Sequence, residues 1–337
     1  MQENWQQLIA QFEPSKAYVL ATIVATQGST YRKSGTMMLI DQQGQCTGLL
    51  SGGCLEADIA LHAEQVFNHQ QSKLLQYDLK ADADLLWGLG LGCEGAIDIL
   101  LQPLTPENEH LGFYQLIQQL EQRKSGFYCQ RIAEQTEPKA AFIACHHDDS
   151  GSVKQALASI KHTDDAAQWL VTPMMPIFSI LLCGAGPDAV PVVTMAQQLG
   201  WHITLQDHRD SHLAQPEFAN CFNRRKLRAE HTTAADFIGF DGVIIMTHNL
   251  TSDGQLLKNA LDAELGYIGL LGPAGRRDKL LNELSLTAKE VNGRVYGPIG
   301  LDLGGRSPQA IALSICAQIQ QFISHQQQHQ GMKSWYL

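Results

Sequence analysis

Residues 180–210 read ILLCGAGPDAVPVVTMAQQLGWHITLQDHRD, and this stretch decides the fold of the second half of the chain. The apolar run at 180–183 predicts a buried parallel strand, Gly184 and Gly186 a tight turn, and the residues after them a helix whose amino end faces a ligand. Asp207 follows the next predicted strand, where an acidic side chain would read a ribose hydroxyl. The pattern predicts a Rossmann-like doubly wound parallel sheet that binds a phosphate-bearing, nucleotide-like ligand.

The glycine pattern departs from the full dinucleotide fingerprint at its third position. Ala189 stands there, which is allowed, and Pro187 suits the first turn of a helix. These glycines could also serve only to turn the chain between a strand and a helix, because the fingerprint specifies a backbone shape before it specifies a cofactor. The pattern therefore predicts the fold more directly than it predicts which ligand binds.

Length, charge and cysteine spacing narrow the class of protein. The 337 residues suit two domains, at about 150 residues each. A net charge of -10 with 24 Lys and Arg argues against general nucleic-acid binding, which relies on basic side chains at phosphates. The sequence shows no apolar run of roughly 20 residues and no signal peptide, so we expect a soluble, cytoplasmic protein without a membrane partner. The eight cysteines include no C-x-x-C pair, so no structural zinc site is predicted.

Hydrophobic periodicity divides the chain into two predicted α/β domains. Residues 1–172 combine short strands, helices and glycine-rich loops, which predicts a mixed α/β domain with a linker at about 146–176. Residues 173–325 alternate strands with helices, as in a parallel sheet covered on both faces. The glutamine-rich residues 326–337 are expected to form a flexible tail or to dock on a partner.

Three loops of the first half share glycine, hydroxyl and charged residues: GSTYRKSG at 28–35, SGGCLE at 51–56 and GLGLGCEG at 88–95. Each could present backbone N–H groups to an anionic ligand, and an arginine could pair with its oxygens. The alternative is that all three are ordinary turns, which glycine and serine favour in any protein. The candidate binding residues in the first two loops are Gly28, Ser29, Arg32, Ser51, Gly52 and Gly53.

Two cysteines are candidates for chemistry. Cys54 follows two glycines at a predicted helix amino terminus, where the helix dipole favours thiolate, so it could be a nucleophile, a sulfur carrier or a soft-metal ligand. Cys93 lies between Gly92 and Glu94 in the third loop and is a second candidate. Glu56 could accept a proton near Cys54 or simply satisfy the helix terminus. The alternative for both thiols is a structural role in the core.

The second half adds candidates at the ends of its strands. MTHN at 246–249 ends a predicted parallel strand, at the sheet edge where ligands bind in such folds, so His248 and Asn249 are site candidates. Arg276 and Arg277 begin another helix and could hold an anion or decorate a solvated face. The sequence shows no Ser-His-Asp order, H-E-x-x-H or G-K-S/T motif, so hydrolases and NTPases have no positive support.

Taken in order, the motifs of both halves resemble those of one family, the XdhC/CoxI family of xanthine dehydrogenase accessory factors, from about residue 15 to residue 323. The motifs are QGSTYRKSGTMML, GLLSGGCLEADI, GLGLGCEG, the stretch 180–210, IIMTHN, YIGLLGPAGRRDKL and GPIGLDLGGRSPQAIALSI. The resemblance implies an amino-terminal XdhC/CoxI domain and a carboxyl-terminal Rossmann-like domain. It also implies a cofactor chaperone that binds molybdenum cofactor (molybdopterin), assists its sulfuration with a cysteine desulfurase and inserts it into the apoenzyme of a xanthine dehydrogenase-type molybdenum hydroxylase. A homodimer is expected on the same ground.

The resemblance also suggests roles for particular residues. Molybdenum cofactor is a pterin with a phosphate and a dithiolene-held metal, so Cys54 is the expected contact near molybdenum or sulfur. Where the family commonly reads Cys-Gly-Gly, Glu94 stands between Cys93 and Gly95, which puts a phosphate contact at this loop in doubt. The Rossmann half could bind the nucleotide part of a dinucleotide form of the cofactor, a separate NAD(P), or nothing.

Three hypotheses from different classes follow. The first is a non-catalytic chaperone that retains molybdenum cofactor. The second is an NAD(P)-dependent oxidoreductase that uses the glycine turn, Asp207 and His248 as an acid or base, although no catalytic constellation is evident. The third is a regulatory module whose Rossmann half has lost its ligand. Retention of molybdenum cofactor or of NAD(P) distinguishes them.

Overall fold

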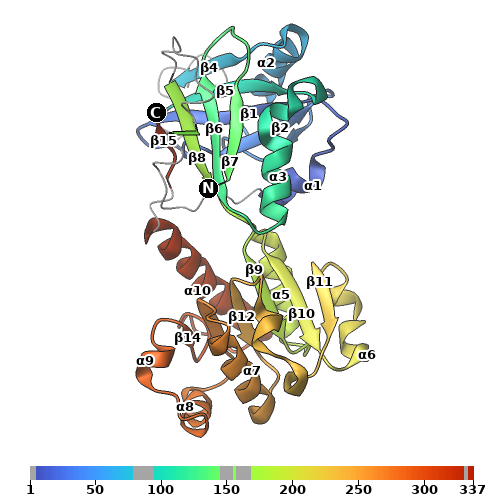
Figure 1. Cartoon of the computed structure of the whole chain (residues 1–337), viewed down its shortest axis with the longest axis vertical. Helices are drawn as coiled ribbons and strands as arrows, with labels where there is room; N and C mark the ends of the chain where they lie inside the picture. Colours follow the sequence, from blue (N-terminus) through green and yellow to red (C-terminus); the bar gives the residue numbers. More distant parts are fainter. Residues whose placement is uncertain (1–4, 79–94, 145–154, 157–167, 330–332) are drawn as a thin grey trace. The chain divides into compact units, whose positions relative to one another are not determined.

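The computed structural model describes residues 5–78, 95–144, 155–156, 168–329 and 333–337 of the chain. These residues form two compact units, which Figure 1 shows in sequence colours. The first unit comprises Met1–Pro176 together with Gln330–Leu337, and the second comprises Ile177–His329. The end of the chain therefore returns to the unit in which the chain begins.

The first unit contains a five-stranded antiparallel sheet. Its strands lie in the order β3-β2-β1-β5-β4. They are β1 (Tyr18–Gln27), β2 (Met37–Asp41), β3 (Cys46–Thr47), β4 (Lys73–Asp78) and β5 (Ala96–Leu104). The central strand β1 is apolar on both faces, since its alternate side chains point in opposite directions and both sets are buried. Such a strand requires a layer on each side of the sheet.

Helices and a second sheet supply those two layers. Val19, Ala21 and Ile23 of β1 pack beneath helix α2 (Glu56–His69). Tyr18 and Leu20 of β1 point the other way, toward short helix α1 (Trp5–Gln11), the turn η1 (Pro106–Gly112), helix α3 (Phe113–Glu121) and the second sheet. The glycine-rich loops of this unit are thus attached to a sheet that is buried on both faces.

The second sheet of this unit corrects two sequence-based expectations. Its strands, in the order β15-β8-β6-β7, are β6 (Gly126–Ile132), β7 (Ala140–Ala144), β8 (Gln168–Met174) and β15 (Trp335–Tyr336). The linker expected at 146–176 is wrong for β8, because the fully buried Trp169, Leu170 and Val171 make it a core strand. The flexible tail expected at 326–337 is wrong at both ends, because its start continues a helix to His329 and Trp335 packs edge-on against Phe127 at 4.9 Å between ring centroids.

The second unit is a six-stranded parallel sheet. Its order, β11-β10-β9-β12-β13-β14, places the first strand of the unit in the middle, next to the fourth. The strands are β9 (Ser179–Cys183), β10 (His202–Asp207), β11 (Asn223–Lys226), β12 (Gly242–Ile245), β13 (Tyr267–Leu270) and β14 (Val295–Tyr296). This is the strand order of doubly wound dinucleotide-binding domains, in which ligands bind where the order reverses, here between β9 and β12. The predicted Rossmann-like fold is confirmed.

Helices cover both faces of the parallel sheet (Figure 1). Helices α5 (Ala189–Gln198) and α10 (Pro308–His329) pack on one face, and α7 (Leu250–Asp262) and α8 (Ala274–Glu283) on the other. The shorter elements are α6 (Asp210–Leu213), α9 (Ala288–Val291), η2 (Pro216–Phe218), η3 (Ala229–His231) and η4 (Ala234–Phe237). Within the described residues, none of these helices is both long and apolar enough to cross a membrane.

Candidate functional site

The glycine-rich loops of the first unit begin or end at one end of the five-stranded sheet. Gln27 at the end of β1 and Asp78 at the end of β4 both pair with Ala96, the first residue of β5. Strand β3 runs antiparallel to β2, with Thr47 opposite Leu39, so the chain after β3 runs back toward the start of β2 at that same end. The first two loops, at 28–35 and 51–56, therefore lie at the same end of the sheet as the residues that flank the third loop.

The third loop is described only at its last residue. Cys93 and Glu94 lie outside the described residues, whereas Gly95 is buried. A Cβ atom on Gly95 would lie 2.5 Å from the carbonyl oxygen of Gln27 and 2.6 Å from that of Ser29. Only glycine fits there, so the end of the third loop packs directly against the backbone of the first.

Ser51, the first residue of the second loop, holds that loop together through its hydroxyl group. Its buried hydroxyl accepts hydrogen bonds from the backbone N–H groups of Gly53, Cys54 and Leu55 at 3.1, 3.1 and 3.2 Å. The same hydroxyl donates to Oε2 of Glu56 at 2.5 Å. The N–H groups that the sequence suggested for an anion therefore converge on a side chain of the loop itself.

Glu56 closes this loop onto the start of helix α2. Its Oε1 atom accepts hydrogen bonds from the backbone N–H groups of Leu50 at 3.1 Å and Ser51 at 2.8 Å. Burial acts to raise the pKa of Glu56, but the hydrogen bonds from Ser51 and Leu50 outweigh it and hold that pKa below its usual range. A proton acceptor works best with a pKa near the operating pH, so this geometry favours a positioning role for Glu56.

Cys54 lies just before helix α2 rather than in its first turn. The helix begins at Glu56, and Leu55 is its N-cap residue. The Cys54 side chain is half-buried, and its Sγ atom lies 3.6 Å from the Ser51 hydroxyl. Gly52 and Gly53 before it are exposed, and a Cβ atom on either would meet nothing within 4 Å. The loop thus places a thiol beside open, accessible backbone.

The first loop presents exposed backbone and one arginine. Gly28 takes a φ of 67°, in the left-handed region, and both it and Ser29 are exposed. The Thr30 hydroxyl donates to the carbonyl of Arg32 at 2.9 Å, and the half-buried Arg32 guanidinium lies 5.0 Å from the centre of the Tyr31 ring. This arrangement keeps a positive charge at the loop-bearing end of the sheet.

In the second unit, the two glycines of the turn after β9 have different surroundings. Gly184 has a φ of 117°, and a Cβ atom there would lie 2.4 Å from the carbonyl oxygen of Met246, just after β12. Gly186 has no atom within 4 Å of that position. The first glycine lets the ends of β9 and β12 pack together, and the second leaves the backbone open to a ligand, as in dinucleotide-binding turns.

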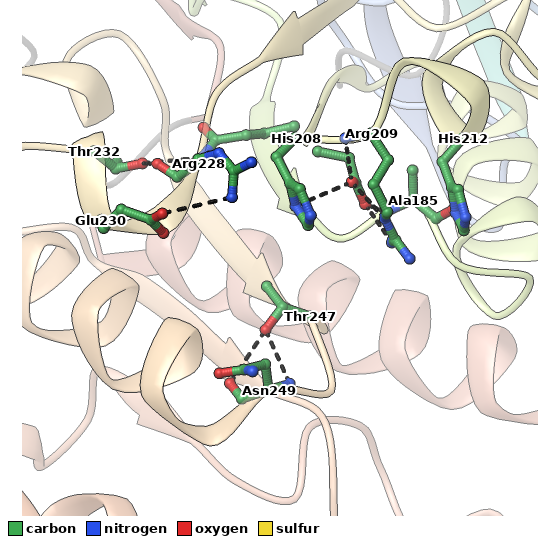
Figure 2. A network of polar contacts seen from close by, with 11 residues as sticks. Ala185, His208, Arg209, His212, Arg228, Glu230, Thr232, Thr247 and Asn249 are labelled. Carbon is green, nitrogen blue, oxygen red and sulfur yellow. Dashed lines mark hydrogen bonds and ion pairs between the residues drawn. The ribbon is translucent and has the colours of Figure 1, made fainter.

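Asp207 binds the same glycine turn from the end of β10. Its Oδ2 atom accepts from the Ala185 N–H at 2.8 Å and from Arg209 Nη2 at 2.7 Å, and Oδ1 accepts from the backbone N–H and Nε of Arg209, both at 2.9 Å (Figure 2). Burial acts to raise the pKa of Asp207, but these hydrogen bonds lower it far below its usual range. Asp207 was predicted to bind a ribose hydroxyl, but both of its carboxylate oxygens already accept hydrogen bonds from the protein.

The candidates after β12 take separate positions. His248 has a left-handed φ of 60°, and its Nε2 atom lies 3.6 Å from a carboxylate oxygen of Asp188 in the glycine turn. Asn249 is the N-cap of helix α7, where its side chain accepts from the Ser252 N–H at 3.0 Å. Its backbone N–H donates to the Thr247 hydroxyl at 3.2 Å (Figure 2). The structure therefore brings His248 to the glycine turn and uses Asn249 to begin a helix.

Sequence reasoning missed two ionic contacts of this unit. Arg209 was not singled out, although DHR places it two residues after the acidic residue of the fingerprint. Asp253 is buried, accepting from the Thr247 hydroxyl at 2.5 Å and from Arg276 Nη2 at 2.6 Å. Arg276 thus pairs inside the fold, whereas Arg277 donates to the carbonyl of Gly297 at 2.7 Å.

Among the described residues, no three His, Cys, Asp or Glu side chains are grouped so as to hold a metal ion. The first unit offers a thiol within a glycine loop, and the second offers a glycine turn at the reversal point of a doubly wound sheet. The two units together define a two-domain α/β protein with a Rossmann second domain.

Comparison with known proteins names this class. Residues 180–319 match the XdhC Rossmann domain, and residues 12–78 match the XdhC and CoxI family. A crystal structure described as a xanthine dehydrogenase from Bacillus halodurans is 30% identical in sequence, covers 95% of each chain and superposes with a TM-score of 0.76. The chain belongs to the XdhC and CoxI family.

Two curated relatives span almost the whole chain. A probable xanthine dehydrogenase subunit of Bacillus subtilis is 29% identical over 322 residues, covering 93% of this chain and 95% of the relative. The molybdenum cofactor insertion chaperone PaoD of Escherichia coli is 23% identical over 316 residues, covering 93% of this chain and 86% of the relative.

Proposed function

We propose that this protein is an accessory factor that binds molybdenum cofactor at the glycine loops of the first unit and inserts it into a xanthine dehydrogenase-type molybdenum hydroxylase. The names of the Bacillus subtilis and Escherichia coli relatives support a role of this kind. The observation that carries the proposal is the loop around Cys54, which a buried serine and a carboxylate hold in shape beside exposed glycines.

The residue types suit this cargo. The cofactor brings its metal already held by a dithiolene, so the protein need add only a soft donor, and the Cys54 thiol is one. Exposed backbone at Gly52 and Gly53 allows close approach of a flat pterin, because no Cβ stands in the way. Arg32, in the neighbouring loop at the same end of the sheet, supplies a positive charge for the phosphate.

The chain's own residues orient the thiol in this proposal. The Ser51 hydroxyl fixes the backbone N–H of Cys54, and Glu56 fixes Ser51, so the backbone that carries the thiol cannot shift without breaking a connected set of hydrogen bonds. Glu56 stays ionised at neutral pH and acts on the cofactor only through Ser51. Cys54 would then hold the cofactor in one orientation until a cysteine desulfurase acts on it.

Retention of the cofactor tests the proposal. Purified full-length protein is incubated anaerobically with molybdenum cofactor and gel-filtered, and bound molybdenum and pterin are measured for wild type, Cys54→Ala and Cys54→Ser. Cys46→Ala is the matched control, since Cys46 is also half-buried in this unit and burial raises the pKa of its thiol. We expect near-stoichiometric retention that falls in both Cys54 variants and survives in the control. No retention by folded wild type would contradict the proposal.

Delivery is tested separately. Loaded wild-type protein is mixed with the apoenzyme of a xanthine dehydrogenase-type hydroxylase, with and without a cysteine desulfurase and a sulfur source. We expect hydroxylase activity that depends on all of these components and that Cys54→Ala reduces. Equal activation by free cofactor would contradict a role in insertion. Gel filtration of the same samples reports whether the chain acts as the homodimer that the family resemblance implies.

A further inference from the structure

The carboxyl edge of the parallel sheet in the second unit is not used by the proposed function. The sheet order reverses between β9 and β12, and the glycine turn lies at that point. Gly186 leaves its backbone open, and helix α5 begins directly after the turn. In this fold these features place a pyrophosphate at the turn and the adjacent ribose at the end of the neighbouring strand, which is β10.

The end of β10 does not suit a ribose that is read by its two hydroxyls. A carboxylate accepts about four hydrogen bonds. Asp207 already accepts four, one from Ala185 and three from Arg209. Its side chain is only 3% exposed. A ribose diol would have to displace the arginine from a buried carboxylate.

Arginine side chains follow the ends of both β10 and β11. His208 and Arg209 follow β10, and Arg228 follows β11, its parallel neighbour (Figure 2). The side chains of Arg209 and Arg228 are 43% and 57% exposed. Arg228 forms a long ion pair, with its Nη1 atom 3.7 Å from a carboxylate oxygen of the exposed Glu230. Arg209 and Arg228 thus follow neighbouring parallel strands in a chain whose net charge is -10.

Arg209 can bind a phosphate while it holds Asp207. A guanidinium has five N–H donors in a rigid fork. Nε and Nη2 of Arg209 point at Asp207, which leaves Nη1 for a second anion at the exposed side. Because Asp207 is neutralised by this contact, it does not repel a phosphate as an isolated carboxylate would.

We infer that the second unit binds a dinucleotide whose ribose carries a 2′-phosphate, as in NADP(H), and that Arg209 determines the preference for it over NAD(H). Arg228 adds to the positive charge around that phosphate. The inference goes beyond the proposed function and does not depend on it, since it concerns other loops, another unit and another ligand.

Nucleotide titration tests the inference on the full-length protein. NADPH and NADH are titrated by their fluorescence, and 2′,5′-ADP, 5′-AMP and CDP compete with them. We expect NADPH to bind at least about tenfold more tightly than NADH, because a charge-assisted hydrogen bond contributes enough for that ratio. We also expect 2′,5′-ADP to compete better than 5′-AMP or CDP. Equal binding of NADPH and NADH, stronger competition by CDP, or no binding by folded protein would overturn the inference.

Variants separate recognition from folding. Arg209→Ala should remove the preference for NADPH, and Arg209→Lys should keep part of it, since lysine retains the charge but loses the fork. Arg228→Ala should weaken NADPH binding without disturbing Asp207. The control is Arg294→Ala, because Arg294 precedes β14 at the opposite edge of the sheet. A preference that persists in folded Arg209→Ala would contradict the role of this residue. Retention of molybdenum cofactor is measured on the same samples, so that either proposal can fail alone.

Discussion

The Ser51 loop of the first unit and the Gly184 turn of the second unit solve the same structural problem with different parts. Each joins a strand to a helix through glycines, and in each a carboxylate with a lowered pKa binds backbone N–H groups of the turn. In the first loop that carboxylate belongs to the following helix and acts through a serine. In the second turn it belongs to the neighbouring strand and holds an arginine.

The two turns therefore present different chemical groups to a ligand. Ser51 and Glu56 leave the half-buried thiol of Cys54 as the reactive group of the first loop. Asp207 leaves a guanidinium, that of Arg209, at the second. One turn therefore suits a soft metal or sulfur and the other a phosphate, although both would be described as glycine-rich loops from sequence.

The largest difference in stability between the two turns should come from replacing one glycine in each by alanine. Gly184→Ala forces a Cβ to 2.4 Å from the Met246 carbonyl at a left-handed φ, so we expect a loss of more than about 2 kcal/mol. Gly52→Ala meets nothing within 4 Å and should change stability by less than about 0.5 kcal/mol. Thermal and urea unfolding measure both, and similar losses in the two variants would remove the contrast between a packed and an open glycine.

The next largest loss of stability should come from replacing Ser51, which has no counterpart in the turn at Gly184. Ser51→Ala removes the acceptor of three N–H groups and the donor to Glu56, so we expect a loss of about 1–3 kcal/mol. Ser29→Ala, at an exposed position of the neighbouring loop, is the control for the unfolding measurements alone. The same unfolding measurements apply, together with cofactor retention, which should fall because Cys54 loses its fixed position. An unchanged Ser51→Ala protein would show that the loop does not depend on this hydroxyl.

A smaller effect should appear in the pH dependence of the free energy of unfolding. Glu56 and Asp207 have folded pKa values below their unfolded ones, so the unfolded chain binds more protons and stability falls as the pH falls. Their contribution is fully present above about pH 4 to 5, near the unfolded pKa values, and disappears as the pH drops through the folded values. Urea unfolding between pH 6 and 3 should therefore show a shallower loss for Glu56→Gln than for wild type. Parallel curves for the two proteins would contradict the assigned shift.

The smallest effect should come from the cap of helix α7. Asn249→Ala removes an exposed N-cap hydrogen bond and should cost about 1 kcal/mol. His248→Ala, one residue earlier and 59% exposed, should change stability less. If Asn249→Ala instead abolished nucleotide binding while leaving unfolding unchanged, Asn249 would be a ligand contact rather than a cap.

Sequence patterns predicted the fold well where they were long and periodic. The apolar run and glycines at 180–186 were enough to predict the parallel sheet, because strand, turn and helix each have a distinct signal there. Strands β11 and β14 were missed, since NRRK has no apolar alternation and VY is too short to show any. Strand β8 lies in the segment expected to be linker because TPMMP suggests a loop, whereas the buried WLV before it forms the strand.

The sequence indicated which loops to consider as a site, but it did not predict the hydrogen bonds within them. Cys54, Glu56 and the glycines were singled out from residue type and position alone. No spacing rule indicates that Ser51 accepts three backbone N–H groups, because its bond to Glu56 spans five residues and does not fit the capping-box pattern. The four bonds of Asp207 likewise depend on how β10 and the glycine turn meet in space. Such contacts follow from tertiary packing, which local sequence does not encode.

The most direct test of the central claim, that the Cys54 loop holds molybdenum cofactor, is the alkylation rate of individual cysteines measured by mass spectrometry with and without bound cofactor. Cys46 in the same unit and Cys221 in the second are internal controls, because burial raises the pKa of both thiols. We expect Cys54 to become protected in proportion to cofactor occupancy while the two controls keep their rates. Unchanged alkylation of Cys54 in fully loaded protein would place the cofactor elsewhere and contradict that claim.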